Sequence, residues 1–340
     1  MSGLPPWLRD WLTWWDTFWF APVDARSVAA MRISLSLLLL WWWVWLYPEL
    51  PLLFSESGLH DAYLLRKHWS LGGDSLLSPL YPALAYVLDG IVAIGLLSPE
   101  FIHGVIDHPH LALTQGWTLE QLQWGHLGGV VLLLAYLLGF GTDVVKFLVL
   151  GLLVVTYHRA PWIWNGGDRL MRIWVLFMCL TPSGAVWSVD AWIKERLGWA
   201  RRTTVPVLVH RLVQWQLIVL YTWTGIDKAM DHFWQYGTAV WFALGDGGYA
   251  RAPWLTDPML HTSLGVWVTG ALTYYTLVFE IGFGPGVLWK KTRNLTLAAG
   301  VALHTGIFFL LSVGMFGPAS VWGYQSYLDW SMPKRDEPNS

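Results

Sequence analysis

The stretch "VLVHRLVQWQLIVLYTWTG" at residues 207–225 is apolar over almost its whole length and is followed at once by "IDKAM" at 226–230. A run of about 20 mostly apolar residues is long enough to cross a bilayer as a helix. The stretch therefore predicts a membrane helix that ends in an acid and a base. Lys228 at this end is open to two interpretations: an ammonium that reaches for interfacial water, or a base that takes part in catalysis.

The rest of the chain has the same character. Hydrophobic residues make up 55% of the 340 residues and charged residues only 13%, which is typical of a polytopic membrane protein. The net charge of −2 gives no electrostatic basis for binding nucleic acid. The 27 tryptophans favour the membrane–water interface, so lipid is an expected partner. Cys179 is the sole cysteine, which excludes an intramolecular disulfide.

The apolar segments predict an all-α fold: a polytopic integral membrane bundle of about 7–8 transmembrane helices with an interfacial helix at its N-terminus. Thr118 and Gln121 have the spacing of a capping box that opens a helix. The apolar piece at 83–97 predicts a re-entrant, interfacial or bundle-packed segment. The spans are predicted at about 28–47, 124–140, 143–158, 169–184, 207–226, 264–288 and 294–312, followed by an apolar segment rich in Gly and Pro near 314–330.

The two ends of the chain differ from the middle. Residues 1–25 carry five tryptophans on a short, charged stretch, which predicts an amphipathic helix lying in the interface. Residues 331–340 predict a short cytoplasmic or disordered tail. The basic loops at 194–202 and 290–293 are expected on the cytoplasmic side, together with the N-terminus. By that count Lys228 is extracytoplasmic.

Ionisable groups inside spans are candidates for function. Lys228 has Asp231 at i+3, which predicts a pair if the helix continues. Glu280 needs a partner, and Arg32 is one candidate. His304 lies deep in an apolar helix, where a structural histidine bonded to a neighbouring helix is as good an interpretation as a catalytic one.

A metal site is a weaker alternative. The stretch "HGVIDHPH" contains His103, Asp107, His108 and His110, but Pro109 interrupts any helix that would align them. No metal is therefore expected.

Four blocks, in order, resemble the HTTM (horizontally transferred transmembrane) domain, the membrane portion of vitamin K-dependent gamma-carboxylase. They are "AMRISLSLLL" around Arg32, "WNGGDRL" at 164–170 with "WSVD" at 187–190, "VLYTWTGIDKAMDHFWQYGTAV" at 219–240, and a last block of Glu280, Arg293, His304 and "GMF" at 314–316. The intervals in the last block, 13, 11 and 10 residues, look the same as those of the family. The resemblance covers most of 26–330, which is expected to form the HTTM-like transmembrane domain.

The resemblance implies a chemistry. In the carboxylase, the lysine that matches Lys228 deprotonates vitamin K hydroquinone, and the oxygenated product removes a γ-proton from a substrate glutamate, which adds CO2. The resemblance thus implies a lyase-type, quinol-dependent enzyme, with reduced vitamin K or menaquinol as cofactor and a secreted or membrane peptide, or a small acid, as substrate. Lys228 and His304 are the expected catalytic residues. The expected cofactor-binding residues are Arg32, Trp164, Asn165, Asp168, Glu280 and Arg293.

Two departures limit what is carried over. Gly167 stands where the carboxylase has a histidine, as in many bacterial-type members, which predicts a bacterial inner-membrane protein. A large soluble C-terminal region is also missing. An accessory membrane protein for maturation or export of a small peptide therefore stays open as an alternative, and a transporter or lipid-binding scaffold as a third.

Overall fold

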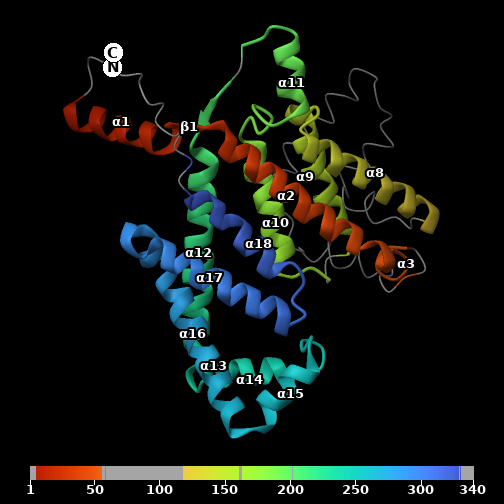
Figure 1. The fold of residues 1–340 in the computed structure, drawn as a ribbon, viewed down its shortest axis with the longest axis vertical. Coiled ribbons are helices and arrows are strands. Elements are labelled where there is room, and N and C mark those ends of the chain that lie inside the picture. Colours follow the sequence, from red (N-terminus) through yellow and green to blue (C-terminus); the bar gives the residue numbers. More distant parts are fainter. Residues whose placement is uncertain are drawn as a thin grey trace, which may run out of the picture.

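A computed structural model describes residues 5–55, 58, 118–160, 163–200, 202–328 and 330. In this part of the chain almost every element is a helix, which confirms the all-α prediction. The helices form an elongated bundle whose long axis is vertical in Figure 1. The predicted segment at 83–97, the histidines at 103, 108 and 110, and the tail at 331–340 lie outside the described residues.

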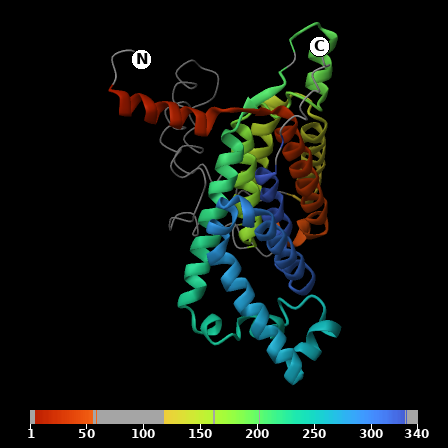
Figure 2. The ribbon, with the colours of Figure 1, turned by 60° about the vertical axis from the view of Figure 1, so that its left-hand side comes forward.

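The N-terminal elements occupy one end of the bundle. Helix α1 (Pro6–Phe20) begins with proline at its first position and buries none of its residues. Strand β1 (Pro22–Asp24) pairs antiparallel with β2 (Thr204–Pro206). Both views show α1 lying across the end of the bundle at a steep angle to α12 (Leu208–Met230) (Figures 1 and 2). This placement is what an interfacial helix requires, and the predicted interfacial role stays a prediction.

Three helical segments are long and apolar enough to cross a membrane among the described residues. The first, Ala25–Leu53, includes α2 (Ala25–Trp45) and contains the span predicted at 28–47. The second is α8 (Leu119–Leu138), which begins at the predicted capping box: Thr118 and Gln121 bond each other's backbone N–H. The third is α16 (Ser263–Leu288).

The other predicted spans also form helices, although their crossing of a membrane stays a prediction. Helix α12 has 23 residues and is therefore about 34 Å long. The apolar segment near 314–330 divides into α18 (Phe316–Gly323) and a 3-10 turn, η3 (Tyr324–Tyr327), and α18 is only about 12 Å long. The remaining long helices are α9 (Thr142–Arg159), α10 (Gly166–Cys179) and α17 (Lys290–Leu310). Shorter ones are η1 (Tyr47–Glu49), α3 (Leu50–Leu53), α11 (Val189–Arg196), α13 (His232–Gln235), α14 (Ala239–Gly245) and α15 (Pro253–His261).

The packing of five helices positions the candidate site. Helix α16 packs against both α12 and α17, and α18 packs against α10 and α17. Gly225 lets α12 and α16 approach closely, since a Cβ on Gly225 would lie 2.9 Å from the backbone nitrogen of Ile281. The neighbour of Ile281 in sequence is Glu280. Close helix approach at small residues is common in membrane bundles, where apolar surface alone gives little driving force.

Candidate functional site

Lys228 forms an ion pair with Glu280 across the α12–α16 interface. The Nζ of Lys228 lies 2.8 Å from Oε2 and 3.1 Å from Oε1 of Glu280, so both carboxylate oxygens accept from the ammonium. The side chain of Glu280 is 8% exposed and that of Lys228 is 23% exposed. The Nζ also lies 5.2 Å from the ring centroid of Trp234, within cation–π range. Glu280 is thus the more buried member of the ion pair, and Lys228 is the more exposed member.

Two predicted pairings are wrong. Lys228 does not pair with Asp231, because α12 ends at Met230 and the Asp231 carboxylate accepts from the backbone N–H of Phe233 to begin α13. Glu280 does not pair with Arg32, whose guanidinium donates instead to the carbonyl oxygens of the loop after α10. Those acceptors are Ser183 at 2.6 Å and Trp187 at 2.5 Å.

A buried chain of three polar side chains lies two helical turns before Lys228. The hydroxyl of Tyr221 is 2.6 Å from Nε2 of His304 and 2.8 Å from the hydroxyl of Tyr324. The interior of the bundle encloses all three residues. In the part of the chain that the structure describes, Nδ1 of His304 has no hydrogen-bond partner. The Nε2 atom of His304 therefore takes part in this chain of hydrogen bonds, and its Nδ1 atom does not.

Aromatic rings and small residues hold this chain in place. The rings of Phe279 and Phe283 pack on Tyr221 with centroids 5.3 and 4.4 Å away. Gly300, one turn before His304, leaves the space that the Tyr324 hydroxyl fills. Apolar rings on every side exclude water, which strengthens the hydrogen bonds inside.

The ion pair and the buried chain are parts of one site. Glu280 follows Phe279 directly, and the Phe279 ring packs on Tyr221 with centroids 5.3 Å apart. Tyr221 and Lys228 are seven residues apart on α12, which places both on the same face of the helix. The arrangement joins an amine, a carboxylate, two phenols and an imidazole in a region that apolar side chains shield. Such a set of groups can hold and relay protons.

Three predicted residues lie elsewhere, at the start of α10. The Asn165 side chain caps the helix by accepting from Gly167 N and Asp168 N, and the Asp168 carboxylate accepts from Asn165 N in return. Trp164 donates to the carbonyl of Tyr157. Trp164, Asn165 and Asp168 line a cavity of about 810 Å³. The other walls include Trp41, Trp42, Trp45, Arg251, Phe308 and Met315.

The start of α18 lies between this cavity and His304, with Met315 lining the cavity and Phe316 contacting the histidine. Gly167 packs directly on the backbone of Phe316, so that even a Cβ at position 167 would overlap the Met315–Phe316 peptide. The ring of Phe316 contacts the His304 ring edge-to-face, with centroids 5.5 Å apart. A histidine in place of Gly167 would not fit between α10 and the start of α18 unless the backbone moved.

Arg293 belongs to a different part of the molecule. It lies in the first turn of α17, eleven residues and therefore about 16 Å before His304 along the helix axis. Its Nε donates to the carbonyl of Val287, and its side chain lines a second cavity. The structure thus unites Lys228 with Glu280, and leaves Arg293 and Arg32 apart from them.

Some residues of the site were not predicted. Tyr221 and Tyr324 carry the hydrogen bonds to His304, and the spacing of seven from Tyr221 to Lys228 was a usable signal in the sequence. Arg251 binds the carbonyls of Phe308 and Leu310 from a loop that no local pattern connects to α17. No group of three or more potential metal ligands occurs among the residues that the structure describes.

Comparison with known proteins identifies the family of this domain. A family model described as the HTTM domain matches residues 104–329, about two thirds of the chain. The chain belongs to the HTTM domain family. The HTTM domain is found in proteins related to vitamin K-dependent carboxylase, and it is a membrane domain. Neither the curated proteins nor the solved structures contain a match to the chain.

Proposed function

We propose that this HTTM protein is a membrane-embedded enzyme that oxygenates or epoxidises a quinol of the vitamin K or menaquinone type, coupled to carboxylation of a peptide or small acid. The observation that carries the proposal is the Lys228–Glu280 pair, which adjoins the buried chain of Tyr221, His304 and Tyr324. A lysine that takes part in proton transfer needs a partner that can store its proton, and Glu280 is in direct contact with it.

The cavity beside α10 has the character that a quinone ring requires. Indole rings of Trp41, Trp42, Trp45 and Trp164 and the ring of Phe308 form apolar walls of a cavity of about 810 Å³. Flat rings stack well on aromatic walls. Polar groups are confined to a few side chains, among them Asn165, Asp168 and Arg251, as in most sites for small molecules. These residues would hold the ring and its oxygens.

The residues of the ion pair would handle the proton. Lys228 can accept a proton only as a neutral amine, so its ammonium first gives one proton to the nearer oxygen of Glu280. The amine then takes up a hydroxyl proton, and the pair ends as an ammonium beside a carboxylic acid. Lys228 does not itself line the cavity of about 810 Å³, so a quinol held there would have to extend its hydroxyl to Lys228 to supply that proton, and it would also supply the electrons that reduce oxygen. Glu280 would then pass its stored proton toward His304 and the two tyrosines, to which no direct hydrogen bond joins it among the described residues.

The proposal includes a membrane topology. We infer that α9, α10, α12 and α17 cross the bilayer of a bacterial inner membrane together with the three apolar segments, with α1 in the interface. The length of α12 supports this, since about 34 Å exceeds the hydrocarbon thickness. The loops at 194–202 and 290–293 would be cytoplasmic and Lys228 extracytoplasmic. Labelling of Lys194→Cys and Tyr236→Cys in a Cys179→Ser background should occur from opposite sides.

The test is turnover. The purified protein in lipid nanodiscs is given menaquinol and oxygen, and quinone epoxide is measured by mass spectrometry. Lys228→Met should lose epoxide formation by a factor of 100 or more, the scale of removing a general base. Lys194→Met, at an exposed position on α11, removes the same charge and should keep wild-type turnover. Equal turnover of Lys228→Met and wild type would refute the role of Lys228.

The ion pair also favours a second function. A lysine held by both oxygens of a carboxylate is what a purely structural contact looks like, and this supports a non-catalytic accessory protein for maturation or export of a small peptide. That protein would support peptide secretion in cells equally well with the Lys228→Met/Glu280→Gln double substitution, whereas the enzyme would not.

A further inference from the structure

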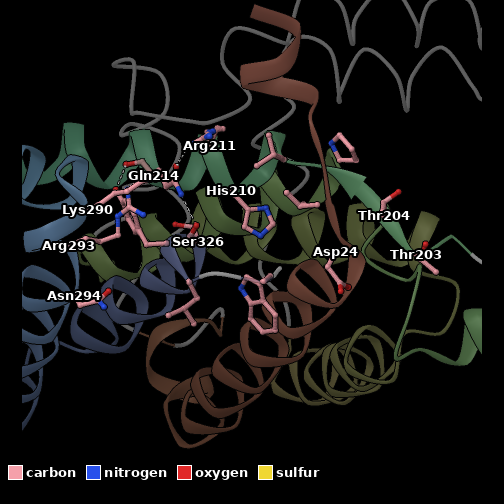
Figure 3. Close-up of a pocket in the computed structure, with 16 residues that line it drawn as sticks. Asp24, Thr203, Thr204, His210, Arg211, Gln214, Lys290, Arg293, Asn294 and Ser326 are labelled. Atoms are coloured by element: carbon pink, nitrogen blue, oxygen red, sulfur yellow. Dashed lines mark hydrogen bonds between the residues drawn. The ribbon is translucent and has the colours of Figure 1, made fainter. Parts of the chain in front are cut away.

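A second large cavity lies at the end of the bundle opposite Lys228. Its volume is about 980 Å³, and it is lined by the β1–β2 ribbon, the first turns of α12 and α17, and residues 326–328 and 330. Arg211, Lys290 and Arg293 line it, and Figure 3 shows them grouped on one side. Asp24 lies on the opposite side and is already paired with Arg26 at 2.6 Å. The basic side of the cavity therefore keeps its positive charge.

His210 gives independent evidence for a ligand. Its side chain lies between the two sides of the cavity in Figure 3, and the residue is only 4% exposed. Within the described ranges, neither ring nitrogen has a hydrogen-bond partner. A buried polar group without a partner costs free energy, and natural proteins seldom leave one unpaired. The imidazole is therefore placed to bond a molecule in the cavity.

Two helix N-termini add to the positive potential. Helices α12 and α17 both begin at this cavity, and neither has a side-chain cap. Uncapped N–H groups and the helix dipole favour an anion at such ends. Lys290 and Arg293 are three residues apart, so they lie on the same face of α17.

The surroundings of the cavity indicate that the anion belongs to a lipid. Arg211 extends from the cavity to α1, where its Nε bonds the carbonyl of Phe18 and its guanidinium lies 4.8 Å from that ring. Helix α1 exposes large tryptophan side chains, including Trp7 and Trp14, as expected of a helix at the membrane surface. A cavity joined to such a helix lies at the depth of lipid headgroups.

We propose that this cavity binds the headgroup phosphate of an anionic glycerophospholipid. Arg211, Lys290 and Arg293 would neutralise the phosphate, and His210 would donate or accept one hydrogen bond. The role is separate from the quinol chemistry, because the cavity lies about 25 Å along α12 from Lys228. Soluble phosphate shares the same chemistry, so the experiment separates the two sources.

The test is native mass spectrometry of the full chain released from a neutral detergent. Phosphatidylglycerol is titrated against phosphatidylcholine, glycerol phosphate and inorganic phosphate. Phosphatidylglycerol should bind most tightly, and Lys290→Gln should weaken it about fivefold, the effect of one basic residue near a membrane surface. Lys290→Gln/Arg293→Gln should weaken it by more. Lys291→Gln is the matched control: it removes the same charge from the adjacent exposed position, which does not line the cavity.

Three outcomes would overturn the proposal. The first is wild-type binding of phosphatidylglycerol by the Lys290→Gln/Arg293→Gln variant. The second is an equal loss in Lys291→Gln, which would indicate general surface charge. The third is binding of inorganic or glycerol phosphate as tightly as the lipid, with the same dependence on Lys290, which would make the ligand a soluble phosphate. Lys290 is exposed, so its variant is expected to fold and the comparison to be decisive.

Discussion

Removal of Lys228 alone should destabilise the protein, and removal of both charges of its ion pair should not. At 2.8 Å, and with an effective dielectric constant of about 20, the Lys228–Glu280 attraction is ~6 kcal/mol. Desolvation of the two groups offsets much of it. Lys228→Met leaves the 8% exposed carboxylate of Glu280 without its cation. Breaking a buried pair in this way costs about 3–5 kcal/mol. Because Lys228 is 23% exposed, we expect the lower figure, ~3 kcal/mol.

The assay is thermal unfolding in detergent, followed by tryptophan fluorescence at one fixed scan rate. For a chain of this size, ~3 kcal/mol corresponds to a lower melting temperature by about 4 °C. Lys228→Met/Glu280→Gln carries neither charge and should melt within about 2 °C of wild type. The same double variant should be inactive in the epoxide assay. Stability and catalysis are thereby measured separately.

Three results would refute this reasoning. If Lys228→Met melts at the wild-type temperature, the pair does not form in the membrane protein as the structure has it. If the two single substitutions lower the melting temperature by amounts that simply add in the double variant, Lys228 and Glu280 are not coupled. If the double variant is both stable and fully active, the pair is structural only.

Three further predictions concern packing, hydrogen bonding and pH. Gly167→Ala should lower the free energy of unfolding by about 1–3 kcal/mol, because its Cβ would overlap the backbone that begins α18; Gly151→Ala, where nothing lies within 4 Å, should melt like wild type. Tyr221→Phe should lower the free energy of unfolding by about 1–3 kcal/mol, because the buried histidine and second tyrosine lose their shared partner. The hydrogen bond from Arg26 holds the pKa of the Asp24 carboxyl below its ordinary value of 3.8. The Asp24–Arg26 interaction therefore makes its full contribution to the free energy of unfolding above about pH 4, and this contribution is lost as the pH falls through the lowered pKa of Asp24. Asp24→Asn should abolish this pH dependence of the melting temperature between pH 3 and 6.

Local signals in the sequence were enough to predict the long apolar helices, but not short ones such as α11 or α13–α15. The capping box at Thr118 and Gln121, and the apolar runs that became α8 and α16, depend on neighbours within a few residues. The apolar segment near 314–330 was located by its composition, but its division into α18 and η3 was not predicted. These elements could be located because hydrophobic periodicity and caps are local properties.

The partners of the ionisable residues could not be predicted in the same way. Lys228 has an acid three residues ahead, yet it pairs with Glu280, which is 52 residues away and is brought close by the approach of two helices at Gly225. Arg32 finds carbonyl oxygens instead of a carboxylate, because the loop after α10 folds back over it. A single sequence carries no information on which helices approach each other. The partners of ionisable side chains on other helices were therefore identified only from the structure.

The β1–β2 ribbon has a consequence for biosynthesis. The strand that holds α1 in place is completed by residues made about 180 positions later in the chain. At about 5–20 residues per second, the N-terminal segment waits roughly 10–40 s for its partner strand. The helices α2, α8, α9 and α10 are all synthesised in that interval. The ribbon can therefore form only late in synthesis. It holds α1 in place only after the helices between β1 and β2 have been made.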